Sequence, residues 1–223
     1  LVQEFLPRQW SFSGNIASKR EIVIDSVQNI RALSSLKDTY SYSYPNVRNF
    51  MENEQIAEFA KGNIAIITTF NSHINSIFAD QFSEIADNIG YAPIPGSQSL
   101  LGAWMLSVNA YSKSPDSAVD FIRWLSSDRV SINSSIMGSA SPKKSAATSE
   151  QIKTIYPWNI FQSEIFAKAR KREVLHDATG RMLSIGDVDE IISEGVASVL
   201  YETMSVEVSL GIMKEKFSRL MGK

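Results

Sequence analysis

The side chains that could carry out acid–base or metal chemistry are few and widely spaced in this sequence. Two histidines are present, His73 and His176, and neither has the His-x-x-x-His or His-Glu-x-x-His spacing that turns two ligands toward one zinc ion. The absence of cysteine excludes thiol nucleophiles, disulfides and cysteine-based zinc sites. No nucleophile elbow, Walker loop or Gly-x-Gly-x-x-Gly turn occurs. We therefore expect no metal, no cofactor and no catalytic residues.

The acidic residues do not change this expectation. Asp187, Asp189 and Glu190 stand at the start of a predicted helix, where the helix dipole favours negative charge for structural reasons. A glycosidase would need two carboxylates at a fixed separation across a cleft. A carbohydrate-active hydrolase of that kind stays open as the enzymatic alternative.

Composition indicates a folded protein without a nucleic-acid partner. Of the 223 residues, 43% are hydrophobic and 21% are charged, which is typical of globular proteins and unlike disordered ones. The net charge of −2 lacks the basic excess that phosphate binding requires. We interpret the basic run at 168–172 as a solvated helical face. No apolar stretch is long enough to span a membrane, and the first residues suggest a mature or truncated chain.

Hydrophobic periodicity predicts strands that alternate with helices in the first half and mainly helices in the second. The predicted strands are 21–25, a run at 64–68 covered on both faces, and 101–110. Apolar spacing predicts helices from 27, from 50 to a stop at Gly62, from 115, and over 158–172, 187–201 and 205–221. This order favours an α/β fold.

An ordered set of short segments carries a resemblance to a known family. The segments are F-A-K-G-N-I-A-I at 59–66, G-Y-A-P-I-P-G at 90–96, G-A-W at 102–104 and S-K-S-P-D-S-A-V-D-F-I-R-W-L at 112–125. Further matches are G-S-A-S-P at 138–142, Arg181 with the helix start after it, and S-V-E-V-S-L at 205–210. Together they resemble the family 1 extracellular solute-binding proteins of ABC sugar importers, the maltose-binding-protein-like group. Ile66, Ala103 and Met182 depart from the family pattern.

The resemblance implies a type II periplasmic-binding-protein-like fold, of which this chain holds mostly the carboxy-terminal lobe. Residues 1–98 would form the first part of that lobe, and residues 141–223 its helical part. Residues 99–140 would belong to the amino-terminal lobe. Family members are near twice this size, so we expect the main sheet of the amino-terminal lobe to lie outside this chain.

The resemblance also implies a set of ligand-binding residues. The family tryptophan that matches Trp104 contacts sugar, and the small residues Gly102 and Ala103 before it would let a ligand approach the backbone. An indole covers the C–H face of a sugar ring, whereas amide and guanidinium groups meet its hydroxyls. The loop after the strand at 64–68 would supply Phe70 or His73 as an aromatic contact and Asn71 for hydroxyls. Arg181 is the candidate for a bidentate hydrogen bond.

The expected function is binding of a sugar or oligosaccharide and its delivery to ABC permease subunits by hinge closure. The expected location is outside the bacterial cytoplasm, as a cell-surface lipoprotein or in the periplasm. The protein would then contact the membrane only through a lipid anchor or the permease. Which sugar is bound stays open. An α/β interaction domain without a small ligand is the non-enzymatic alternative.

Overall fold

The computed structural model describes residues 1–19, 21–78, 85 and 88–222. The chain divides into two compact units. Unit 1 comprises residues 1–43, 94–101 and 168–223, and unit 2 comprises residues 44–93 and 102–167. The expected assignment of residues 1–98, 99–140 and 141–223 to lobes stays a prediction.

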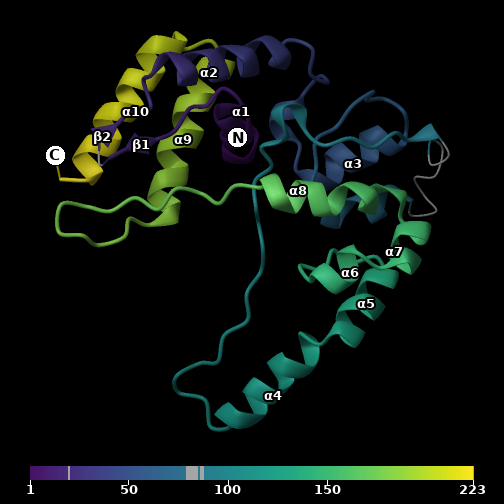
Figure 1. Ribbon diagram of the computed structural model, residues 1–223. Helices are drawn as coiled ribbons and strands as arrows, with labels where there is room; N and C mark the ends of the chain where they lie inside the picture. Colours follow the sequence, from purple (N-terminus) through teal and green to yellow (C-terminus); the bar gives the residue numbers. More distant parts are fainter. Residues whose placement is uncertain (20, 79–84, 86–87, 223) are drawn as a thin grey trace. The chain divides into compact units, whose positions relative to one another are not determined.

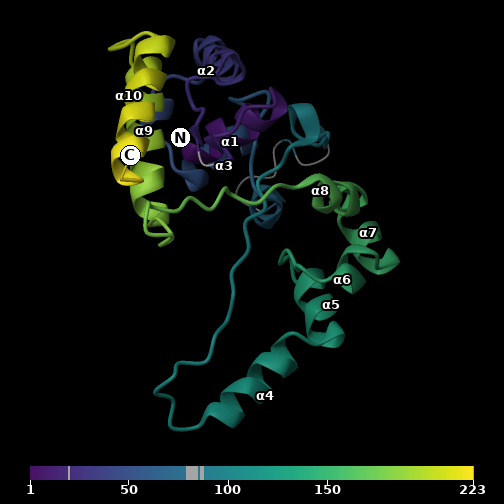
Figure 2. The same cartoon turned by 60° about the vertical axis from the view of Figure 1, so that its left-hand side comes forward.

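Unit 1 is built mainly from helices around one apolar core. Its elements are α1 (Val2–Ser11), β1 (Ala17–Ser18), β2 (Glu21–Ile22), α2 (Val27–Tyr40), the 3₁₀ turn η4 (Pro95–Ser97), α9 (Ile185–Leu200) and α10 (Val206–Leu220). Helices α9 and α10 lie side by side (Figures 1 and 2), and each also packs on α2. Phe5, Leu33, Ile192, Leu210 and Phe217 are completely buried between these helices, which makes this cluster the core of the unit.

Helices α9 and α10 of unit 1 each begin after a serine whose side chain accepts a backbone hydrogen bond. Ser184 accepts a hydrogen bond from Gly186 N at the start of α9, and Ser205 accepts one from Val208 N at the start of α10. Such serines satisfy backbone N–H groups that have no partner inside the first turn. The expected helices from 27, over 187–201 and over 205–221 are therefore confirmed, with boundaries shifted by one or two residues.

Unit 2 consists of short helices and long connecting segments. Its elements are η1 (Val47–Asn49), α3 (Glu52–Ala60), η2 (Asn71–Phe78), α4 (Pro115–Leu125), α5 (Asp128–Ile136), α6 (Lys144–Ala147), α7 (Glu150–Ile155), η5 (Pro157–Phe161) and α8 (Gln162–Lys168). Helix α3 ends before Gly62, whose φ of 77° is the left-handed conformation that glycine adopts freely. Helix α4 begins at Pro115 as expected, but Trp124 on its apolar side is 59% exposed.

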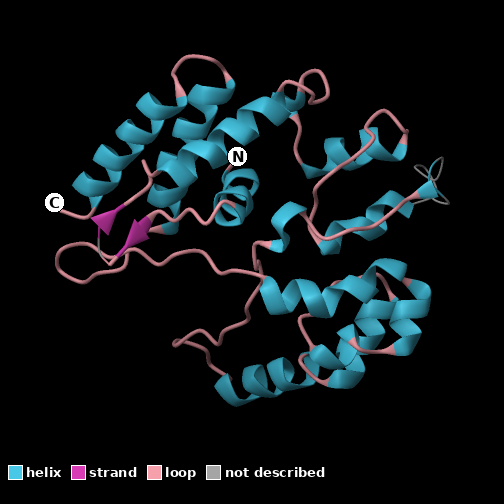
Figure 3. Ribbon diagram, turned by 45° about the horizontal axis from the view of Figure 1, so that its top comes forward, coloured by secondary structure: helices cyan, strands magenta, loops and turns pink. Residues whose placement is uncertain are grey.

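The predicted strands are largely absent from the described residues. The strand at 21–25 is reduced to β2, which pairs with β1 in an antiparallel two-stranded sheet (Figure 3). The segments 64–68 and 101–110 form no strand, although Leu101 N donates to Arg170 O, so these two strand predictions are wrong for this structure. Ile66 is 86% exposed, against the expected cover on both faces. A strand forms only beside another strand, and the described residues place none next to either segment.

The basic run is also not the solvated helical face that we expected. Helix α8 ends at Lys168, and the chain beyond it is extended. The guanidinium of Arg170 lies 5.0 Å from the centroid of the Trp10 ring, and its backbone pairs with residues 99 and 101. Arg172 Nη1 lies 2.6 Å from Asp189 Oδ2. Two residues of the basic run, Arg170 and Arg172, therefore make tertiary contacts through their guanidinium groups.

Candidate functional site

The turn at 70–73 in unit 2 brings together three of the residues predicted to bind a ligand. His73 N donates to Phe70 O at 3.0 Å, which closes the turn at the start of η2. The rings of Phe70 and His73 are 6.4 Å apart, and a Cβ built on Gly102 would lie 3.5 Å from Phe70 Cε1. Phe70 and His73 are half-buried, whereas Asn71 is exposed. An aromatic ring, an imidazole and an accessible backbone therefore share one surface.

A carboxylate completes the polar side of this turn. His73 Nε2 lies 3.4 Å from Glu52 Oε2, which makes an ion pair when the imidazole is protonated. Glu52 is the first residue of α3, where the helix dipole favours its negative charge. The sequence did not indicate a role for Glu52. Its contact with His73 joins residues 21 positions apart, and no helical or strand periodicity relates the two positions.

Ala103 and Trp104 follow Gly102 along the chain; Ala103 is exposed and Trp104 is fully open to solvent. The relative exposure of Trp104 is 102%, so its indole has both faces free in this structure. Arg181 belongs to unit 1 and lies in a tight turn, where its backbone N donates to Asp177 Oδ1 at 2.9 Å. Hydrogen bonds from Thr179 and Arg181 hold the pKa of Asp177 below its usual value. The role of each of these residues in ligand binding stays a prediction.

A second group of aromatic rings in unit 2 was not expected. The Trp158 ring stacks on Phe78 at 5.3 Å and meets the tilted rings of Tyr91 at 5.3 Å and Tyr156 at 4.9 Å. Tyr156 OH donates to Ile136 O at 2.8 Å, which fixes its ring. Because the other three rings all contact Trp158 and all four rings are half-buried, this cluster packs unit 2. Their sequence positions share no motif that could have predicted the cluster.

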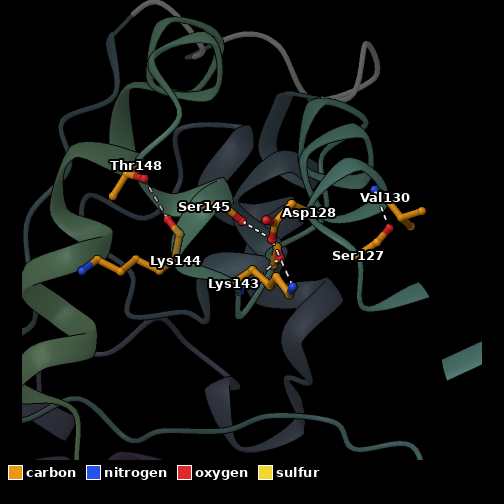
Figure 4. A network of polar contacts seen from close by, with 8 residues as sticks. Ser127, Asp128, Val130, Lys143, Lys144, Ser145 and Thr148 are labelled. Carbon is orange, nitrogen blue, oxygen red and sulfur yellow. Dashed lines mark hydrogen bonds and ion pairs between the residues drawn. The ribbon is translucent and has the colours of Figure 1, made fainter. Parts of the chain in front are cut away.

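A polar network at the start of α5 holds the segment after it in place (Figure 4). Asp128 Oδ1 accepts hydrogen bonds from Lys143 Nζ at 3.0 Å and Ser145 Oγ at 2.9 Å. Both partners lower the pKa of the Asp128 carboxyl. The serine donates directly to a carboxylate, and no imidazole stands between them to act as a base. This arrangement ties 143–145 to α5 and has a structural role.

Over the part of the chain that the structure describes, histidine, aspartate and glutamate side chains form no group of three or more that could hold a metal ion. Within those same residues, no helix has the length and apolar character needed to cross a membrane.

Comparison with solved structures defines the class of fold. The structure superimposes on maltose-bound MalE3 of T. maritima with a TM-score of 0.84, at 22% identity, over 99% of this chain and 57% of that one. It also matches the GacH receptor of Streptomyces glaucescens, solved unliganded and with acarbose, with a TM-score of 0.74 at 22% identity, over 98% of this chain and 56% of that one. The fold is therefore that of the type II periplasmic-binding proteins, as the sequence predicted.

Sequence comparison then identifies the family. Residues 9–131 match the family described as bacterial extracellular solute-binding protein, and the chain belongs to it. A probable ABC transporter-binding protein of Deinococcus radiodurans is 23% identical over 222 residues, which are 96% of this chain. A probable amino-acid ABC transporter periplasmic-binding protein of Sinorhizobium fredii is 38% identical over 64 residues, which are 29% of this chain and 15% of that protein. The chain spans only 52% of the Deinococcus protein, about half its length.

Proposed function

We propose that this chain is the larger part of the carboxy-terminal lobe of an ABC-importer binding protein whose ligand is a sugar or oligosaccharide. The observation that carries the proposal is the cluster of Phe70, His73 and Gly102 at the end of an extended segment. A pyranose offers apolar C–H faces to Phe70 and Trp104, and hydroxyls to Asn71, His73 and Glu52. The names of MalE3 and GacH, solved with maltose and acarbose, support a sugar ligand.

The proposed mode of action is binding followed by delivery, without chemistry on the ligand. Closure of two lobes around the sugar would present the closed form to permease subunits in the membrane. The site would lie outside the bacterial cytoplasm, in the periplasm or on a cell-surface lipoprotein. Family membership supports this location and the permease as partner.

This chain by itself should bind sugar weakly. Trp104 is uncovered here, and the other half of a two-lobed cleft would come from polypeptide beyond this chain. We expect a dissociation constant of about 1 mM or weaker, which is about −4 kcal/mol. An NMR titration with maltose, maltotriose and acarbose, on this chain and on the longer protein, measures it.

Two tryptophan variants test the site in that titration. Trp104→Ala should weaken sugar binding by at least about tenfold through lost stacking, whereas Trp124→Ala, which removes another exposed indole, should leave the affinity unchanged. Phe70→Ala should weaken binding in the same way as Trp104→Ala. Equal affinities in all three variants would reject this site. Turnover of an aryl glycoside by the purified protein would favour the hydrolase alternative.

An amino acid is the second candidate ligand, because the Sinorhizobium relative is named for amino-acid transport. The same titration with a panel of L-amino acids separates the two ligand classes. Binding of an amino acid that Trp104→Ala leaves intact would replace the sugar proposal. No binding of either class by the longer protein would favour the interaction-domain alternative.

A further inference from the structure

Helix α3 and the 3₁₀ segment η2 form one packed pair in unit 2. Ile56 of α3 and Ile77 of η2 are 2% and 3% exposed and belong to one apolar cluster. Glu52 and His73 belong to the same two elements, and their side chains meet at 3.4 Å. Because the apolar cluster fixes the elements on each other, packing sets the position of this carboxylate beside the imidazole.

The two elements carry no permanent positive charge. The acids of α3 are Glu52, Glu54 and Glu58, whereas η2 contains no lysine or arginine, and its His73 is charged only when protonated. Glu54 accepts a backbone hydrogen bond at the start of α3, and Glu58 pairs with Lys61 at the far end. Glu52 pairs with no lysine or arginine among the described residues, so a neutral imidazole leaves its negative charge uncompensated.

The Phe70 ring adjoins the same imidazole as the Glu52 carboxylate. The centroids of the Phe70 and His73 rings are 6.4 Å apart, and the Phe70 ring is half-buried, so part of it remains open to a ligand. The face of an aromatic ring is partly negative and attracts cations. The ring and the carboxylate therefore both favour a positively charged group at this turn.

A sugar hydroxyl and an ammonium group differ in what they offer Glu52. Both donate a hydrogen bond, but only the ammonium also compensates the negative charge, and charge-assisted hydrogen bonds of this kind are the stronger ones. The Glu52 side chain is 48% exposed, so water screens the attraction and the added affinity is modest. The charge of the site thus selects among ligands that fit it equally well.

We propose that the ligand of this site carries a primary ammonium group and is an amino sugar. The ammonium would donate to the Glu52 carboxylate while the C–H face of the sugar ring covers Phe70. This proposal rests on the proposed sugar-binding function and adds the charge of the ligand to it. An L-amino acid carries the same ammonium group, so the experiment includes one.

Three matched sugars test the charge directly. Glucose, glucosamine and N-acetylglucosamine are titrated into the 15N-labelled 223-residue chain near neutral pH, and the backbone amides of Asn71 and His73 are followed by NMR. Glucosamine should bind about fivefold more tightly than either neutral sugar. N-acetylation keeps the nitrogen and removes its charge. Ionic strength is held constant, because salt screens the attraction.

Two glutamine variants locate the selectivity. Glu52→Gln keeps the size of the side chain and removes its charge, so the preference for glucosamine over N-acetylglucosamine should disappear. Glu150→Gln is the matched control, because Glu150 is also the first residue of a helix in unit 2 and its side chain is 86% exposed. That variant should retain the preference.

Equal affinities for glucosamine and N-acetylglucosamine in the unmodified chain would overturn the proposal, and so would an undiminished preference in folded Glu52→Gln. The first comparison decides the matter even if the variant does not fold. Saturable binding of glucose without a preference for glucosamine would overturn this inference alone and leave the sugar-binding function standing. Glu52-dependent binding of L-leucine, with no binding of any of the three sugars, would overturn both.

Discussion

Glu58 in unit 2 receives three hydrogen bonds on one carboxylate. Lys61 Nζ lies 2.8 Å from Oε1, Asn63 Nδ2 lies 2.7 Å from Oε2, and the Tyr44 hydroxyl is the third donor. These donors, with Lys61 first, lower the pKa of Glu58 to about 2. They join the end of α3 to the turn after it, just before the extended segment that leads to Phe70.

The lowered pKa of Glu58 predicts an acid-dependent loss of local stability. A carboxylate whose folded pKa is depressed stabilises the fold above its unfolded pKa, and this contribution is lost as pH falls from 4.5 toward about 2. The Glu58 side-chain carbon, followed by NMR, should titrate with a midpoint near that lower value. Glu58→Gln should remove this part of the acid dependence, whereas Glu215→Gln in an exposed pair should retain it. A Glu58 midpoint above 4 would contradict the hydrogen-bonded arrangement.

At the scale of elements, Gly195 of α9 lies against Met213 of α10. A Cβ on Gly195 would lie 2.0 Å from Met213 Cε and 2.7 Å from Met213 Cγ. Ser198 and Ser209 both donate to Gly195 O at 2.8 Å, and they join the two helices through one carbonyl. Side chains larger than hydrogen cannot enter this contact without a shift of Met213 or of the helix itself.

Two glycine-to-alanine changes in this helix pair should act in opposite directions. Gly195→Ala should lower the free energy of unfolding by about 1–3 kcal/mol through overpacking. Gly211→Ala on α10, where nothing lies within 4 Å of the added methyl, should raise it by up to about 1 kcal/mol. Urea denaturation of both variants measures the difference. Equal stabilities would show that the helices separate easily at Gly195.

At the scale of the whole molecule, two segments with strand-like sequences have no strand beside them among the residues that the structure describes. Met105 is 90% exposed, Leu106 is 58% exposed, and the amides of residues 102–108 donate no backbone hydrogen bond among the described residues. This chain covers 57% of MalE3 at a TM-score of 0.84, so a large part of that fold has no counterpart here. We propose that polypeptide from that remaining part pairs with residues 102–110.

Hydrogen exchange should report this missing pairing directly. In the 223-residue chain, amides of residues 103–108 should exchange within seconds at neutral pH, whereas amides in the middle of α9 and α10 should be protected by orders of magnitude. In a longer protein with the complete fold, the same amides should become protected. Strong protection of 103–108 in this chain alone would show that the segment already has a partner.

The family and the positions of the long helices could be predicted from the sequence because both depend on local information. Ser184, Ser205 and Pro115 mark helix starts through contacts within one turn, and the family motifs are runs of neighbouring residues. The contact of Glu52 with His73 could not be predicted from the sequence, because no helical or strand periodicity relates the two segments that it joins.

Sequence patterns therefore determined the family, the fold class and the long helices α2, α9 and α10, since caps and apolar periodicity act over a few residues. Whether 64–68 and 101–110 form strands depends on the tertiary structure, because a strand requires hydrogen bonds from a distant segment. An apolar cavity in unit 1, lined in part by Trp10, is likewise a product of packing. It exists where α1, α9 and the segment between 172 and 183 leave a space that no single stretch of sequence encodes.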